Sequence, residues 1–302
     1  MCKATRDFGV SQTSTIYGSP VDTCTRRDVQ ALKSLSIYLA ENALTVSTRN
    51  SYDRAKLTCN EFLSKYFPGA PMFPMTNEQL VLFISYCYQK ELSPQTVTTY
   101  MSALAHFHKM EGYPDPTQNF ILKRTIQGFS KLKARPDTRL PITPIILQRI
   151  INSLPKCTQS FYQRTLFKAM FLLAFHAFLR VGEITSPTKN TLNLSAVSFE
   201  KQQNGVPECM TLTMVDFKHH RGKPPVTFHL NANKDKPELC AVLAMWEYKE
   251  LRGGSDGPLF MFQDKSPVSS HYFNQQLKIS LNYLNYDTKL YKGHSFRLVQ
   301  LR

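Results

Sequence analysis

The segment Phe178-Leu-Arg-Val-Gly-Glu-Ile184 puts a charged arginine, Arg180, at the end of an almost wholly apolar run. That run, Phe161 to Leu179, is long enough for a helix and predicts one at the centre of a hydrophobic core. A guanidinium beside a core has to meet an anion or water. Taken alone, Arg180 is best explained by a salt bridge at a helix C-terminus, with Glu183 as its partner.

Two later segments carry further basic residues. Lys218 ends a predicted strand beside the basic segment His219-His-Arg-Gly-Lys-Pro-Pro225, and His294-Ser-Phe-Arg297 places His and Arg three residues apart. On a helix, side chains at that spacing share a face. Each segment alone has an ordinary explanation, a solvated turn lysine for the first and chance for the second. The ordered set Arg180, Lys218, His294 and Arg297 is the informative feature.

The composition favours a polyanionic partner. The chain has 302 residues, 42% of them hydrophobic, and a formal net charge of +15 at pH 7. The length suggests about two domains of roughly 150 residues each. Both halves are basic, and Lys and Arg neutralise phosphates and release their counterions. A merely basic soluble protein remains the alternative at this point.

The cysteines and the apolar runs restrict the compartment. Seven cysteines occur without any C-x-x-C pair, so we expect neither a zinc module nor a disulfide framework, and a reducing compartment fits best. The apolar runs are too short to span a bilayer, and the N-terminus lacks an apolar signal core. We therefore expect a soluble intracellular protein, nuclear if the host is eukaryotic and otherwise cytoplasmic.

Helical signals fill the first half of the chain. We expect a flexible tail over 1–22, a helical domain over 23–130, a basic linker over 131–142 and a second domain over 143–302. Caps that predict helix starts are Thr25 with Asp28, Thr76 with Gln79, and Ser93 before Pro94. The expected helical segments are 25–39, 52–66, 76–87, 93–112 and 120–129.

The second half mixes helices with strands. We expect helices from Thr143, over 161–179, over 237–251 and over 269–284. Between them lie strand-like runs at 192–199, 210–217 and 226–230, the last two flanking the basic tip. The predicted fold class is therefore mainly α with a small antiparallel β-sheet. A helical domain precedes an α+β domain.

The ordered basic set resembles the tyrosine recombinase and integrase superfamily. Leu92-Ser-Pro-Gln-Thr-Val97 with Tyr100-Met-Ser-Ala-Leu104 is similar to that family's core-binding domain, and Leu140-Pro-Ile-Thr143 to the opening of its catalytic domain. The segment 178–184 resembles its first-arginine motif. Gly257-Pro-Leu-Phe260 and Gly293-His-Ser-Phe-Arg297 are similar to the Crypton and DIRS-type recombinases of eukaryotic transposons. The resemblance covers about residues 25 to 302.

The resemblance implies a role for each basic residue. Arg180 and Arg297 would hold the scissile phosphate, because guanidinium groups match phosphate oxygens and stay charged. Lys218 would protonate the leaving 5′-oxygen, and His294 would assist proton transfer. Arg221 and Lys223 compete with Lys218 for that role and are otherwise expected to contact DNA. The family needs no metal or cofactor.

The resemblance also implies a tyrosine nucleophile, and no tyrosine follows Arg297. Tyr272, Tyr283, Tyr286 and Tyr291 precede the motif and are expected to be core or surface aromatics. We therefore expect a C-terminally truncated recombinase that lacks the family's last helices and is inactive alone. The three origins that stay open are an incomplete gene model, a decayed transposon and a retained derivative.

The expected partner is double-stranded DNA, with no membrane and no small-molecule substrate. On the helix from Pro94, the residues expected to reach DNA are Thr96, Thr99, Tyr100 and Lys109, although Tyr100 could equally belong to the core. The chain is expected to form an oligomer on DNA, which could include a full-length relative that donates the tyrosine. The alternatives are a catalytically dead, transposon-derived DNA-binding module and a helical protein-interaction scaffold.

Overall fold

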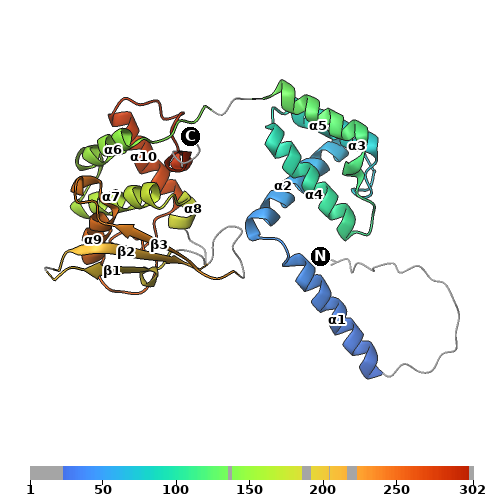
Figure 1. Ribbon diagram of the computed structural model, residues 1–302. Helices are drawn as coiled ribbons and strands as arrows, with labels where there is room; N and C mark the ends of the chain where they lie inside the picture. Colours follow the sequence, from blue (N-terminus) through green and yellow to red (C-terminus); the bar gives the residue numbers. More distant parts are fainter. Residues whose placement is uncertain (1–22, 135–137, 186–191, 204, 216–222, 299–302) are drawn as a thin grey trace. The chain divides into compact units, whose positions relative to one another are not determined.

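The computed structural model describes residues 23–134, 138–185, 192–203, 205–215 and 223–298 (Figure 1). The chain divides into two compact units, Met1–Pro136 and Asp137–Arg302. The expected tail over 1–22 and part of the expected linker lie outside the described residues. Among the described helices, none is long and apolar enough to cross a membrane.

Unit 1 is helical throughout its described part. Its helices are α1 (Thr23–Glu41), α2 (Val46–Tyr66), α3 (Asn77–Gln89), α4 (Pro94–Met110) and α5 (Phe120–Leu132), with a 3₁₀ turn at Pro116–Gln118. The capping box predicted at Thr76 is present, because the Thr76 N–H donates to Gln79 Oε1 at 2.8 Å and the Gln79 N–H to Thr76 Oγ1 at 3.2 Å. Ser93 also caps α4 as predicted.

Several helix boundaries in unit 1 differ from the sequence prediction, and α2 begins at Val46, six residues before the expected start at 52. Helix α1 begins at Thr23, so Thr25 lies inside the helix and not at its cap. Helix α5 continues to Leu132, which places the first residues of the expected linker in the helix. Asn119 caps α5, and its side chain accepts the Ile121 N–H at 2.8 Å.

The core of unit 1 lies between α2, α3, α4 and α5. Cys59, Phe83, Leu104 and Leu122, one from each of these helices, are all fully buried. Helix α1 is different, because its apolar side chains are exposed; Leu32, for example, is 64% exposed. The packing that stabilises unit 1 therefore comes from the later helices.

Unit 2 combines helices with a small sheet. Its helices are α6 (Pro144–Cys157), α7 (Phe161–His176), α8 (Val181–Ile184), α9 (Ala241–Arg252) and α10 (Ser270–Tyr283). Its described strands are β1 (Val197–Lys201), β2 (Pro207–Met214) and β3 (Val226–Asn231), antiparallel in the order β1-β2-β3. Short 3₁₀ turns lie at Leu194–Ala196, Pro237–Leu239 and Gly293–Phe296. The predicted fold class is confirmed.

The sheet covers α9 with one face (Figure 1). Met210, Leu212 and Met214 of β2 alternate with less buried residues, and the buried set packs into the unit's core. The strand expected from Leu192 begins only at Val197, because residues 194–196 form a 3₁₀ turn. The end of the strand expected at 217 lies outside the described residues.

Helix α7 is the centre of the unit 2 core, as the sequence predicts. Its side chains from Leu166 to Ala174 include a run that is fully buried, Ala169 to Ala174. The helix ends at His176, short of the expected Leu179, because Phe178 adopts a left-handed backbone conformation with φ 51°. That turn redirects the chain, so that Arg180 stands before a new helix, α8.

A buried arginine fixes the loop after α9. Arg252 is 7% exposed, and its guanidinium donates to the carbonyl oxygens of Gly253, Ser255, Pro258 and Leu259 at 2.7–3.2 Å. Burying an arginine is tolerated where its donors are satisfied. Arg252 thereby holds the Gly257-Pro-Leu-Phe260 segment against the core.

Candidate functional site

Arg180 is held by Glu183 at the start of α8. The Arg180 N–H donates to Glu183 Oε2 at 2.6 Å, and Nη1 of its guanidinium donates to Oε1 at 2.6 Å. The Arg180 side chain is 41% exposed and the Glu183 side chain 10%. The predicted salt bridge with Glu183 is therefore present, but at the N-terminus of α8 and not at a helix C-terminus. The carboxylate orients a guanidinium that still faces solvent.

The His294–Arg297 segment forms a 3₁₀ turn and not the expected helix. The turn covers Gly293–Phe296, and the Arg297 N–H donates to the His294 carbonyl at 3.0 Å. Residues three apart still project to the same side, because a 3₁₀ helix has three residues per turn. His294 is exposed and Arg297 half-buried, whereas Ser295 and Phe296 are buried. The turn thus directs its basic side chains outward.

An aromatic cluster anchors this turn in the core. The Phe296 ring stacks on Phe171 of α7, with centroids 5.7 Å apart and an interplanar angle of 24°, and meets the Phe273 ring of α10 edge-on. All three rings are fully buried. Such ring pairs add about 0.5–1.5 kcal/mol each beyond their burial. The position of Arg297 is therefore tied to α7 and α10.

The segment that opens unit 2 also pairs with the turn. The Leu140 N–H donates to the Leu290 carbonyl at 2.8 Å, and the Ile142 N–H donates to the Ser295 carbonyl at 3.0 Å. Ser295 in turn accepts the Lys292 N–H through its hydroxyl at 3.0 Å. The segments 140–143 and 293–297 thus lie side by side.

The Arg180 element and the turn are in direct contact. Gly293 lies against Val181, the residue after Arg180, so closely that a Cβ atom at position 293 would collide with Cγ2 of Val181. The structure therefore brings together the elements that carry Arg180, His294 and Arg297. Lys218 and Arg221 lie outside the described residues. Lys223 is exposed just before β3.

Most unit 1 residues expected to reach DNA make internal contacts. Thr96 Oγ1 lies 2.8 Å from Ser93 Oγ at the α4 cap, and Thr99 Oγ1 donates to the Gln95 carbonyl at 3.0 Å. Tyr100 packs on the core and stacks on Phe83 with an interplanar angle of 17°. The structure therefore favours the alternative that Tyr100 belongs to the core.

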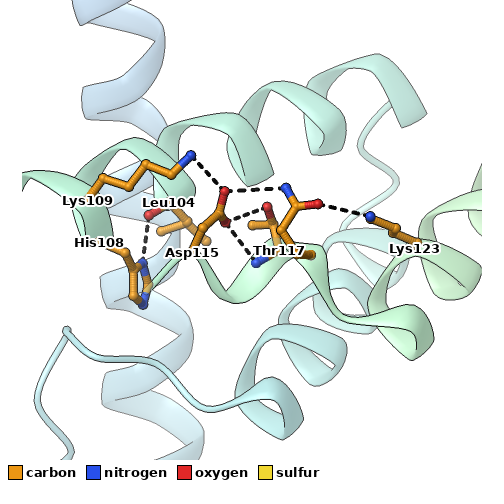
Figure 2. A network of polar contacts seen from close by, with 7 residues as sticks. Leu104, His108, Lys109, Asp115, Thr117 and Lys123 are labelled. Atoms are coloured by element: carbon orange, nitrogen blue, oxygen red, sulfur yellow. Dashed lines mark hydrogen bonds and ion pairs between the residues drawn. The ribbon is translucent and has the colours of Figure 1, made fainter. Parts of the chain in front are cut away.

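Lys109 anchors the loop between α4 and α5. Its Nζ lies 2.9 Å from Asp115 Oδ2, and Asp115 Oδ1 accepts the backbone N–H and the hydroxyl of Thr117 at 3.0 and 2.7 Å (Figure 2). Burial alone would raise the pKa of Asp115, but the hydrogen bonds from Lys109 and Thr117 outweigh it and lower that pKa. Lys109 thus anchors this loop through Asp115.

The outward face of α4 carries residues that the sequence reasoning missed. Gln95, Thr98 and Ser102 are exposed and lie opposite the buried Val97 and Met101. Plotting the apolar 3.6-residue period and taking its opposite face would have identified them. Thr98 and Ser102 make the same kind of backbone hydrogen bond as Thr99, so exposure alone distinguishes this face of α4 from Tyr100.

The four tyrosines that precede Arg297 most closely in the sequence lie in different surroundings. Tyr286 Oη accepts a hydrogen bond from Arg149 Nη1 at 2.8 Å, and Tyr291 is 9% exposed. Burial, with a smaller effect of Tyr286, raises the pKa of Tyr291, which disfavours the phenolate. Tyr272 and Tyr283 are exposed on α10. Among the described residues, no group of His, Cys, Asp and Glu is arranged to hold a metal.

No protein-family model matches the chain, and no curated protein is similar to it in sequence. Solved structures with the same fold do match. The XerH site-specific recombinase, bound to palindromic difH substrate in a post-cleavage complex, shares 20% identity over 84% of this chain and 69% of that one, with a TM-score of 0.59.

Two integrases match similarly. A lambda integrase dimer bound to a COC′ core site shares 15% identity over 93% of this chain and 73% of that one, with a TM-score of 0.54. The Tn1549 transposon integrase in complex with circular intermediate DNA shares 13% identity over 84% of this chain and 79% of that one, with a TM-score of 0.52. The chain has the fold of the tyrosine recombinases.

Proposed function

We propose that the chain binds double-stranded DNA in the manner of a tyrosine recombinase, with Arg180 and Arg297 on one phosphate. The observation that carries this proposal is the packing of Gly293 on Val181, which joins the two arginine-bearing elements. Guanidinium groups match phosphate oxygens with two parallel hydrogen bonds and keep their charge at every physiological pH. The net charge of +15 supports the same partner.

The remaining roles follow from the resemblance. In this proposal His294 assists proton transfer at the phosphate, and Lys218 protonates the leaving 5′-oxygen, with Arg221 and Lys223 contacting DNA nearby. Two arginines would also stabilise the charge that builds up on the phosphate in the transition state. The similarity of 257–260 and 293–297 supports an affiliation with the Crypton and DIRS-type branch. That branch would place the protein in the nucleus of a eukaryotic host.

The attacking tyrosine, in this proposal, is not one of the 302 residues of the sequence. No tyrosine follows Arg297 in them, and burial raises the pKa of Tyr291, the tyrosine nearest to the His294–Arg297 turn in sequence. A residue of a longer polypeptide or of another protomer would supply the hydroxyl. An assembly of several protomers on DNA fits this requirement.

A catalytically inactive, transposon-derived DNA-binding module is the second candidate function. It needs the same phosphate contacts and no nucleophile, so the packing of Gly293 on Val181 supports it as well. A protein-interaction scaffold would not need the exposed guanidinium of Arg180 beside the turn that carries His294.

Binding to a labelled mixed-sequence duplex, measured by fluorescence anisotropy across a salt series, tests the proposal. We expect log Kd to rise linearly with log salt, and non-specific Kd values to be about 10⁻⁴–10⁻⁶ M at physiological salt. Arg297→Ala should lower the slope of log Kd against log salt by about one, the effect of losing one phosphate contact. Arg180→Lys should weaken binding while keeping a cation beside Glu183. Salt-independent binding, or none at low salt, contradicts the proposal.

Lys265→Asn is the matched control. Lys265 is an exposed cation in a turn with φ 64°, a backbone conformation that asparagine tolerates. Its loss removes one positive charge without touching the arginine elements. A nicked suicide substrate tests both candidates, since neither predicts a covalent protein–DNA adduct from these 302 residues alone, and such an adduct would show that the nucleophile lies within them.

A further inference from the structure

A continuous chain of hydrogen bonds links the Arg180 element to the first turn of α10. The Thr185 hydroxyl donates to the Val181 carbonyl at 2.7 Å and lies 2.6 Å from the Ser270 hydroxyl. Thr185 is 2% exposed, whereas Ser270 is exposed, so this contact is partly shielded from water. Helix α8 is thereby fastened to Ser270.

The same turn of α10 holds the segment that carries His294 and Arg297. The Asn274 side chain donates through Nδ2 to the Ser270 carbonyl at 2.7 Å and accepts the Gly293 N–H through Oδ1 at 3.0 Å. Both ends of the amide are therefore in use. Because Asn274 is exposed, water competes for these hydrogen bonds. The packing of Gly293 on Val181 therefore also has to hold the turn in place.

Gly293 is clamped from two directions. Its Cα rests on Val181, with no room for a Cβ, while its N–H is taken by Asn274. The 3₁₀ turn can therefore neither move away from α8 nor rotate about its own start without breaking one of the contacts. These two contacts fix the turn that carries Arg297 against the helix that follows Arg180.

We propose that Ser270 and Asn274 are positioning residues that set the spacing between Arg180 and Arg297 for one phosphate. The proposal rests on the function proposed above. Neither side chain is expected to touch DNA for this purpose. Each acts through the backbone of an arginine-bearing element, Ser270 through Thr185 and Asn274 through Gly293.

A small change in the spacing between Arg180 and Arg297 matters because both guanidinium groups have to align with the oxygens of one phosphate. Charge-assisted hydrogen bonds are short, at about 2.7–2.9 Å between heavy atoms, and weaken with misalignment. When the turn shifts, Arg297 keeps its charge but loses its alignment relative to Arg180. Non-specific attraction should then persist while the joint contact weakens.

The test is a double-mutant cycle in duplex binding with the full chain. We expect Asn274→Ala to weaken binding about five-fold, the equivalent of about one hydrogen bond. In an Arg297→Ala background the same substitution should change the affinity by less than about two-fold, because residues that act together are not additive. A merely structural role would weaken binding equally in both backgrounds.

The neighbouring residues supply matched controls. Gln275→Ala removes an amide from the exposed face of the same helix and should leave the affinity unchanged. Ser270→Ala should weaken binding, and Ser270→Thr, which keeps the hydroxyl, should restore it. Equal effects of Asn274→Ala and Gln275→Ala, or additive effects of Asn274→Ala and Arg297→Ala, would overturn the proposal while leaving DNA binding in place.

A second measurement stands apart from DNA. Amide hydrogen exchange at Gly293, followed by NMR in the free protein, should accelerate several-fold in Asn274→Ala and stay unchanged in Gln275→Ala. Unchanged exchange at Gly293 would show that Asn274 does not hold the turn. Failure of the proposed function is recognised separately, because then neither the wild-type chain nor Arg297→Ala would show salt-dependent binding.

Discussion

Substituting Gly293 by alanine should strain the contact between the turn and α8. The added methyl group would overlap Cγ2 of Val181 and press on Oδ1 of Asn274, so one element has to move. Overpacking of this kind costs about 1–3 kcal/mol. For a unit of this size, each kcal/mol lowers Tm by about 2–4 °C, so we expect a decrease of about 2–12 °C.

Trp246 makes the measurement specific to unit 2. It is the single tryptophan of the sequence and lies on α9, with the Phe199 ring of β1 5.3 Å from its own and Lys201 Nζ 4.0 Å from its centroid. Loss of unit 2 packing should therefore change its fluorescence. Thermal and urea unfolding followed at this residue report the stability of unit 2 without a signal from unit 1.

Two further variants, a control at Gly182 and a compensating substitution at Val181, test whether the loss of stability comes from the contact between Gly293 and Val181. Gly182→Ala lies one residue from Val181, where a Cβ meets nothing within 4 Å, and should leave Tm unchanged or raise it. Val181→Ala removes the colliding methyl group, so the double variant with Gly293→Ala should be more stable than the sum of the single losses by about 0.5–3 kcal/mol. Strictly additive losses, or equal Tm values for the two glycine variants, would refute the close contact.

Three further predictions concern stability. Lys109 and Thr117 lower the pKa of Asp115 in the folded chain against the effect of burial. The contribution of Asp115 to stability is therefore complete above its unfolded pKa of 3.8 and is lost as pH falls below that value. In an acid titration followed by a Tyr88→Trp reporter in a Trp246→Phe background, the chain with Asp115 should lose stability more steeply than Asp115→Asn. Arg252→Met should cost about 1–3 kcal/mol in Trp246-monitored urea unfolding, because it leaves the buried Leu259 carbonyl and the part-buried Pro258 carbonyl without their donor; a loss below about 1 kcal/mol would contradict that role. Leu32→Ser should change the stability of unit 1 by no more than about 0.5 kcal/mol, whereas Leu104→Ala in the core should cost about 2–5 kcal/mol, by calorimetry; comparable losses would show that α1 is covered in solution.

The sequence predicts those parts of the fold that depend on neighbouring residues. The Thr76–Gln79 box and the Ser93 cap before Pro94 are local hydrogen-bonding devices, and both occur where expected. The sequence also predicts the buried run of α7, since its apolar residues leave no polar face. The alternation of apolar residues in β2 also predicts a strand, and the fold class follows from these elements.

Contacts between distant segments explain the errors. The left-handed turn at Phe178 cannot be foreseen from a phenylalanine, and it shortens α7 and moves Arg180 from a helix end to a helix start. The turn at Gly293 is set by Ile142 and Val181, far away in sequence. Asn274 carries no signal in the sequence, because an asparagine in a predicted helix usually faces solvent.

The backbone pairing of Leu140 and Ile142 with Leu290 and Ser295 has a consequence for synthesis. The two partners come from opposite ends of unit 2, so the ribosome makes them many seconds apart at about 5–20 residues per second. Unit 1 can fold while unit 2 is still emerging. The opening segment of unit 2 has no native partner until translation has passed Ser295, and long-range pairing of this kind forms slowly. A nascent chain therefore exposes Arg180 long before it acquires the turn that packs on Val181.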